Sequence, residues 1–258
     1  MGSSNVQGPL WSTAAEVWEE VFEPVRTPLY EAMLDACGVV AGKHLLDAGC
    51  GSGAASSRAA LRGAIVSGLD AAEGMIERAR RQAPDGDFRV EDLEELPFDD
   101  RAFDVVVAFD SVQFSEDKVA AIAEMGRVCR PDGTVAIALF DEEEKNEMRV
   151  ITSAMAETLP EPPKGGPYAL SKAGLLEDLI DKAGLNVLGS NSVPLDYRFE
   201  NFEQFWRGVL SSGNTQAMIR VVGEETIGEA VRAATEPYIG SSGEVLFKNS
   251  FRFVTAVP

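Results

Sequence analysis

The sequence is poor in the side chains that bind metal ions. It has one histidine, His44, and three cysteines, Cys37, Cys50 and Cys129, none of them in C-x-x-C spacing. A zinc site needs about four such ligands close together, so we expect no metal. A small, odd number of cysteines in apolar or glycine-rich surroundings predicts reduced thiols and therefore a cytoplasmic protein.

Basic residues are also scarce. The chain has 23 Lys and Arg against 42 Asp and Glu, a formal net charge of −19 in 258 residues. Proteins that bind nucleic acids draw much of their affinity from Lys and Arg on phosphates, so we expect no nucleic-acid partner. Long apolar runs are missing as well, and Met1–Asn5 lack the basic and apolar regions of a signal peptide, so we expect no membrane association.

Glycine and aspartate stand at regular positions near the start of the sequence. An apolar run ends at Asp47, then Gly49, Gly51 and Gly53 follow, and a second apolar run ends at Asp70. This order predicts a strand, a glycine turn, a helix and a second strand. Such a turn lets backbone approach a ligand, and an acid after the second strand can accept hydrogen bonds from a ribose. The alternative is a turn that only closes a corner between strand and helix.

The glycine turn alone does not identify the nucleoside, because it also satisfies the dinucleotide pattern G-x-G-x-x-G/A. The segments that follow it settle the choice. Four motifs come after it in order: Ala71–Ile76, Phe88–Phe98, Phe103–Phe109 and Arg127–Val135. With them the chain resembles the class I S-adenosylmethionine (SAM)-dependent methyltransferases. The likeness is to the small-molecule branch that includes ubiquinone and menaquinone biosynthesis. It is strong over about residues 40–140 and weak to about 190.

The resemblance implies SAM as methyl donor and S-adenosylhomocysteine as product. It implies that Asp70 binds the ribose hydroxyls, Asp92 accepts from the adenine amino group, and the carbonyl of Phe109 meets the methionine ammonium group. Met75 would pack on adenine, although it could also be core filler. The full set of cofactor residues implied is Asp47, Gly49, Gly51, Gly53, Asp70, Ala71, Met75, Asp92, Leu93 and Phe109. Ala72 departs from the family, which often has serine there.

Strands and helices are expected to alternate through the chain. We predict an α/β, Rossmann-like, seven-stranded, mostly parallel, doubly wound sheet whose last strand is antiparallel. Pro131–Gly133 should form a turn before the fifth strand, and Ser171 should be the N-cap of a helix over 172–183. The seven strands are expected near 43–48, 64–70, 87–91, 103–109, 133–140, 185–198 and 245–257.

Three segments interrupt or precede this alternation. Residues 1–40 should form a helical lid, 141–170 and 199–241 should be cap insertions, and 41–198 with 242–258 should form the SAM-binding domain. The loops after the fifth and sixth strands begin at the edge of the sheet where ligands bind, so the insertions should cover the site. Their aromatic residues suit a small apolar acceptor or form the core of the cap itself. The candidates for acceptor binding are Trp11, Trp18, Tyr168 and Trp206.

Polar residues after the fourth strand are the candidates for catalysis. Asp110 and Gln113 should lie beside the transferred methyl group, whereas His44 opens the first strand at the opposite edge. A base is needed only if the acceptor atom, O, N or C, carries a proton. Asp110 could instead cap its own turn, with no side-chain base in the reaction. Two further functions stay open: a non-methylating SAM-binding cyclase or binding protein, and an NAD(P)-dependent enzyme.

Overall fold

A seven-stranded sheet lies at the centre of the computed structural model, which describes residues 4–161, 163 and 165–258. Its order is β3-β2-β1-β4-β5-β7-β6; β1 to β5 are parallel, and β7 is antiparallel to both of its neighbours. The predicted fold class is confirmed. The strands are β1 (His44–Ala48), β2 (Ile65–Asp70), β3 (Asp87–Val90), β4 (Phe103–Phe109), β5 (Cys129–Phe140), β6 (Asn186–Phe199) and β7 (Val245–Val257).

Part of what the sequence predicts lies outside the described residues. Residues 1–3 belong to the predicted lid and to the N-terminal segment that lacks the features of a signal peptide. Pro162 and Lys164 belong to the predicted 141–170 insertion.

Two local predictions were wrong. Pro131–Gly133 lie inside β5, which already pairs with β4 at Cys129, and the register of that pair is irregular between Phe103 and Val105. Ser171 is not an N-cap, because α8 (Leu175–Lys182) begins after Gly174. The hydroxyl of Ser171 instead donates to the carbonyl of Phe140 at 2.9 Å, so it fixes the preceding loop to the end of β5.

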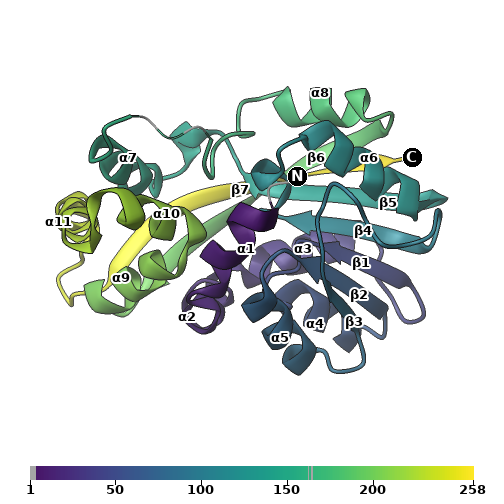
Figure 1. Ribbon diagram of the computed structural model, residues 1–258, viewed down its shortest axis with the longest axis horizontal. Helices are drawn as coiled ribbons and strands as arrows, with labels where there is room; N and C mark the ends of the chain where they lie inside the picture. The colour runs from purple at the N-terminus through teal and green to yellow at the C-terminus, as the bar shows by residue number, and fades with distance from the viewer. Residues whose placement is uncertain (1–3, 162, 164) are drawn as a thin grey trace.

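Helices cover both faces of the sheet, because alternate side chains of a strand point to opposite faces. Leu45 packs in the core with α3 (Thr27–Ala36), α4 (Ala54–Leu61) and α5 (Glu73–Gln82). Leu46 packs on the other face with α6 (Lys118–Val128) and α8 (Figure 1). Among the described residues, no helix combines the length and apolar character that crossing a bilayer would require.

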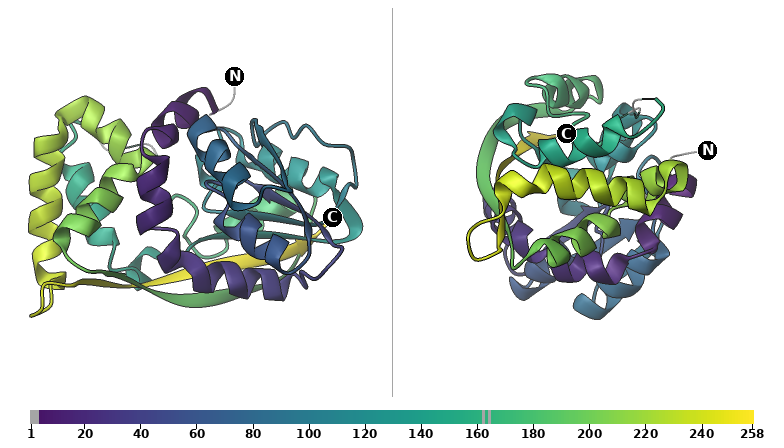
Figure 2. Two further views of the ribbon diagram at one scale, coloured as in Figure 1. Left: turned by 90° about the horizontal axis from the view of Figure 1, so that it is seen from below. Right: turned by 90° about the vertical axis from the view of Figure 1, so that its left-hand side faces the viewer.

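A second group of helices lies beyond the sheet, and we call it the cap (Figures 1 and 2). It consists of α1 (Ser4–Ser12), α2 (Ala15–Val21), α7 (Arg149–Glu157), α9 (Phe202–Ser211), α10 (Gly213–Val222) and α11 (Glu224–Thr235). The described part of the chain also forms four short 3₁₀ turns: η1 (Pro24–Arg26), η2 (Val112–Phe114), η3 (Glu143–Lys145) and η4 (Glu236–Tyr238).

The last two strands carry much of the cap. β5 pairs with β7 only through Phe251–Ala256, whereas β6 pairs with β7 along its whole length. Residues 194–199 and 245–250 therefore form a two-stranded extension, which we call the arm. Figure 2 shows these ribbons leaving the sheet and running beneath the helices that connect them, α9, α10 and α11.

The arm and the cap share one hydrophobic core with the sheet. Phe205 of α9 is fully buried, and its ring centroid lies 5.1 Å from that of Phe199 and 5.2 Å from that of Phe247, both in the arm. The same cluster of buried residues continues to Leu45 in β1. The position of the cap is therefore fixed by apolar burial and not by loop connections alone.

We expect Phe205→Ala to lower the free energy of unfolding by about 3–5 kcal/mol, because it leaves a cavity between cap and arm. Phe202→Ala, in the same helix but only partly buried, should cost less than half as much. Urea unfolding followed by circular dichroism measures both. Equal losses for the two variants would show that the contact between cap and arm does not carry this stability.

Candidate active site

A cavity of about 830 Å³ lies between the carboxyl ends of β1, β2 and β4 and the cap. It brings together most of the residues singled out in the sequence, from segments far apart in the chain. Gly53 and Trp206 are not among its described lining residues; Gly53 packs on α5, and Trp206 packs beside Gly228 in α11. The predicted residues that line it are Trp11, Trp18, Asp47, Gly49, Gly51, Asp70, Ala71, Met75, Asp92, Leu93, Phe109, Asp110, Gln113 and Tyr168.

The three glycines of the turn all have positive φ, but they are needed for different reasons. A Cβ on Gly49 (φ +80°) would lie 2.2 Å from Cβ of Ser111, and one on Gly53 (φ +91°) would lie 2.8 Å from Cα of Ala79. These two glycines allow close packing of the chain on itself. A Cβ on Gly51 (φ +53°) would meet only a carboxylate oxygen of Glu23, at 3.7 Å, so the space beside Gly51 belongs to the cavity.

Two aspartates hold the turn. Asp70 accepts from the amide of Gly51 at 3.0 Å and from that of Ala72 at 2.9 Å. Asp47 is 1% exposed and accepts from the hydroxyl of Ser56 at 2.7 Å, whereas its Oδ1 has no hydrogen-bond partner. Burial raises the pKa of Asp70 and raises that of Asp47 to about 7. Two carboxylates with raised pKa values thus lie beside the turn.

The predicted nucleoside end of the cavity also contacts the cap. Met75 is buried in a small cluster against which Trp11 and Trp18 pack, so the start of α5 touches α1 and α2. Asp92 accepts from the amide of Glu94 at 3.0 Å, which fixes the loop after β3. Met75 and Asp92 both line the cavity.

Asp110 has an unusual backbone conformation for a residue other than glycine. Its φ is +50°, directly after β4, and its amide donates to the carbonyl of Ala138 at 2.9 Å. Its carboxylate lies 3.1 Å from Nη1 of Arg26 and accepts from Nε2 of Gln113 at 3.4 Å. Burial raises the pKa of Asp110, and the positive charge of Arg26 opposes that rise. Backbone strain of this kind is often found at functional sites.

Arg26 connects the cap to this carboxylate. Besides Asp110, its Nε donates to the hydroxyl of Tyr197 at 2.9 Å, and its guanidinium lies 4.7 Å from the ring centroid of Trp18. Sequence reasoning missed Glu23, Arg26 and Tyr30 as cavity residues. In the sequence, these three residues are distinguished only as polar side chains among apolar ones between Phe22 and Leu34. No known motif predicts that residues in such a pattern belong to a binding site.

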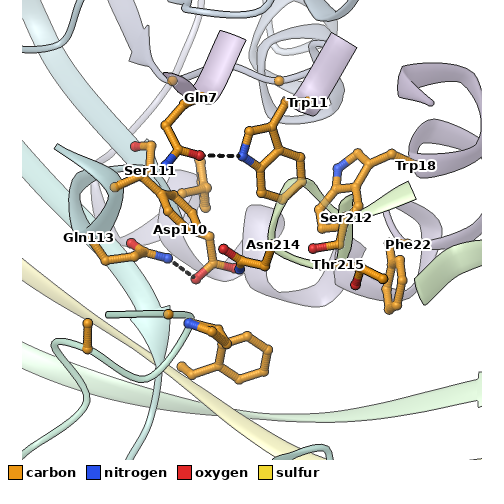
Figure 3. A pocket seen from close by; sticks show the side chains of 18 of the residues that line it. Gln7, Trp11, Trp18, Phe22, Asp110, Ser111, Gln113, Ser212, Asn214 and Thr215 are labelled. Atoms are coloured by element: carbon orange, nitrogen blue, oxygen red, sulfur yellow. Dashed lines mark hydrogen bonds between the residues drawn. The ribbon is translucent and has the colours of Figure 1, made fainter. Parts of the chain in front are cut away.

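The rest of the lining is mostly apolar. Trp11 and Trp18 pack edge to face with centroids 4.9 Å apart, and Trp18 lies 5.1 Å from Phe22. In Figure 3 these rings lie on one side of the view, and Asp110 and Gln113 lie on the other. The ring of Tyr168 packs on Phe140, and its hydroxyl is buried without a hydrogen-bond partner. Further apolar lining comes from Met148, Ile151, Met155, Val209 and Met218.

Comparison with known proteins agrees with this geometry. Residues 46–137 match a family described as "Methyltransferase domain". A demethylmenaquinone methyltransferase of Renibacterium salmoninarum is 34% identical over 129 residues, which is 50% of this chain and 54% of that protein. A malonyl-[acyl-carrier protein] O-methyltransferase of Serratia marcescens is 40% identical over 94 residues, 36% of this chain and 37% of that protein. The chain thus matches about half or less of the length of these relatives.

A solved structure extends the likeness in fold. A Bacillus halodurans protein described as a candidate methyltransferase superposes with a TM-score of 0.60 at 14% identity, covering 88% of this chain and 97% of that one. At such low identity the match shows the fold alone. Taken with the sequence matches, it confirms the resemblance stated from the motifs. Residues 46–137 of this chain are similar to the methyltransferase domain family, and the fold of the chain is that of a Rossmann-like methyltransferase.

Proposed function

We propose that this protein transfers the methyl group of SAM to a small, largely apolar acceptor. The observation that carries the proposal is the continuity of the cavity, which runs from the glycine turn and Asp70 to the aromatic residues of the cap. Its volume of about 830 Å³ is in the upper part of the range typical of small-molecule sites, which supports room for two ligands. The named relatives are methyltransferases, so a non-methylating function is not favoured.

The residues around the glycine turn fit SAM. The open space beside Gly51 suits a ligand that lies close to backbone. Asp70 at the end of β2 retains lone pairs for two ribose hydroxyls, and Asp92 also lines the cavity. When bound, SAM supplies a methyl group on a positively charged sulfur. We also propose that the adenine packs on Met75 and that the carbonyl of Phe109 receives the ammonium group.

The cap supports an apolar acceptor. Holding acceptor and methyl donor in line provides much of the rate enhancement in a displacement reaction, and a dry site strengthens the electrostatic interactions within it. Trp11, Trp18 and Tyr168 line the cavity and are the residues we propose to contact the acceptor. Trp206 lies outside the lining and is left out of this proposal.

Asp110 is the residue we propose to receive the proton of the acceptor. It lies in the cavity at the end of β4, and Arg26 and Gln113 hold its carboxylate in one orientation. Arg26 also keeps the carboxylate charged, since a neighbouring cation favours the ionised form. For an acceptor atom that carries no proton, Asp110 and Gln113 would only orient the acceptor.

Two further proposals concern where the protein works and what it binds. We propose a cytoplasmic protein, because all three cysteines are unpaired and buried, which suits a reducing compartment. We also propose a small-molecule partner and no nucleic-acid partner, because the net charge of −19 repels phosphates.

The function is tested by incubating the protein with methyl-deuterated SAM and a small-molecule extract, and by following labelled products by mass spectrometry. We expect a labelled apolar product, formed about 10–100-fold more slowly by Asp110→Asn, because proton transfer typically contributes a factor of this order or more. Asparagine tolerates the positive φ at this position. Because burial raises the pKa of Asp110, the wild-type rate should fall as pH is lowered, starting above the usual range of an aspartate.

The matched control for this variant is Asp132→Asn, an exposed residue in β5 at the other edge of the sheet. It should retain the wild-type rate. If the protein binds S-adenosylhomocysteine but forms no labelled product, the result would contradict methyl transfer to the metabolites in that extract. An Asp110→Asn rate equal to wild type would contradict the role of Asp110.

Gly51→Ala should remove binding of S-adenosylhomocysteine while the protein stays folded, because its Cβ enters cavity space and not packed chain. We expect affinity to fall at least tenfold by calorimetry. Gly184→Ala is the control, with φ +86° and no atom near its Cβ, so it carries similar backbone strain far from the turn. Each variant should lose about 1–2 kcal/mol of stability. Unchanged affinity in Gly51→Ala would contradict the proposed cofactor position.

A further inference from the structure

Glu23 is a buried carboxylate that the cap brings to the glycine turn. It lies between α2 and η1, is 6% exposed, and lines the cavity. A Cβ on Gly51 would lie 3.7 Å from its Oε1, so the carboxylate faces the turn. Its other oxygen, Oε2, is buried without a hydrogen-bond partner. A buried acceptor left unpaired costs free energy, and an ionised one costs more.

Asp47, in β1, also has a buried carboxylate oxygen without a hydrogen-bond partner. Its Oδ2 is occupied by the hydroxyl of Ser56, and its Oδ1 is buried and unpaired. Both Asp47 and Glu23 line the same cavity. Two segments far apart in the chain, β1 and the link between α2 and η1, thus each place an unpaired carboxylate oxygen in this region.

Positive charge is scarce around these acids, although Arg26, Ser52 and Gln82 partly offset the effect of burial on the pKa of Glu23. The negative charges of Asp70 and Glu23 both contribute to raising the pKa of Asp47, and burial raises the pKa of Glu23. Among the described lining residues the one cation is Arg26, which is engaged by Asp110 and Tyr197. A ligand that brings positive charge and several hydrogen-bond donors would satisfy both carboxylates.

We propose that Glu23 is a cofactor-binding residue, and that its carboxylate and that of Asp47 join the carbonyl of Phe109 in receiving the ammonium group of the amino-acid arm of SAM. This inference rests on the proposed function. An ammonium group has three N–H donors and a full charge, whereas the sulfonium has no donor and the ribose hydroxyls have no charge. The charge-assisted bond to Glu23 would be one of the stronger contacts to the cofactor.

This contact would also link the cap to the cofactor. Glu23 follows α2, whose Trp18 packs in the cluster of Met75 and stacks on Arg26. Arg26 in turn holds Asp110. Binding of the ammonium group by Glu23 would therefore stabilise the segment that positions the tryptophans and the proposed proton acceptor, so the acceptor site is completed when SAM is bound.

Calorimetry with two ligands tests the inference. S-adenosylhomocysteine carries the ammonium group, and 5′-methylthioadenosine has the same nucleoside without the amino-acid arm. In Glu23→Gln we expect the affinity for S-adenosylhomocysteine to fall about tenfold or more, the usual effect of losing a charged hydrogen bond. The affinity for 5′-methylthioadenosine should change less than twofold, which also reports that the variant is folded.

The matched control is Glu20→Gln, in α2 just before Glu23, whose carboxylate forms an exposed ion pair with Arg207. It should bind both ligands as the wild type does. Glu23→Asp keeps the charge but shortens the side chain, and we expect an intermediate affinity for S-adenosylhomocysteine. It serves as the second variant if Glu23→Gln does not fold.

Three outcomes would overturn the inference. Equal losses for both ligands would show that Glu23 supports the turn or the nucleoside and not the amino-acid arm. Unchanged affinity for S-adenosylhomocysteine in both Glu23 variants would show that the carboxylate does not meet the ammonium group, while the proposed function stands. A wild-type protein that binds neither ligand would refute the proposed function itself.

Discussion

The hydrogen-bonded pairing of β6 with β7 is the interaction on which the rest of the structure depends. The ladder continues past the end of β5, so the arm projects beyond the sheet and carries α9 to α11. Burial of Phe205 between Phe199 and Phe247 fixes these helices to the arm. The ends of the parallel strands then face a wall of cap side chains and not solvent. A shorter hairpin would leave the glycine turn at an open edge.

The second feature of the site is a shortage of positive charge. The acids of the turn and Asp110 face a cavity whose one described lining cation, Arg26, belongs to the N-terminal part of the chain. A carboxylate that is buried away from water is stable in its charged form only beside a cationic partner. The proposed positively charged methyl donor would provide one, and this complementarity would explain the carboxylates that lie around one backbone turn. The proposed roles of Glu23 and Asp110 follow from the same shortage.

The sequence predicts the sheet and the turn well because both depend on local pattern. Apolar runs that end in acids predict the positions of β1 and β2. The glycines at 49, 51 and 53 predict the turn between β1 and the helix that follows. Glu23 and Arg26 could not be predicted, because their partners, Gly51 and Asp110, are distant in sequence and are brought close only by packing of the cap.

The errors of the sequence-based predictions have the same physical origin. Ser171 resembles an N-cap by its neighbours, but its hydroxyl bonds to Phe140 across the fold. Trp206 has the aromatic character expected of an acceptor site, yet helix α9 packs it against Gly228 and away from the cavity lining. A pattern in sequence identifies which face of a helix is apolar, and tertiary packing decides what that face covers.

The measurement that tests the central claim most directly is a crystal structure of the protein with S-adenosylhomocysteine. The account predicts the ribose at Asp70, the amino-acid arm at the turn between Asp47 and Glu23, and the sulfur facing the region between Asp110 and the tryptophans of the cap. A complex in which the ligand binds outside this cavity, or in which its sulfur faces away from the cap, would contradict the account.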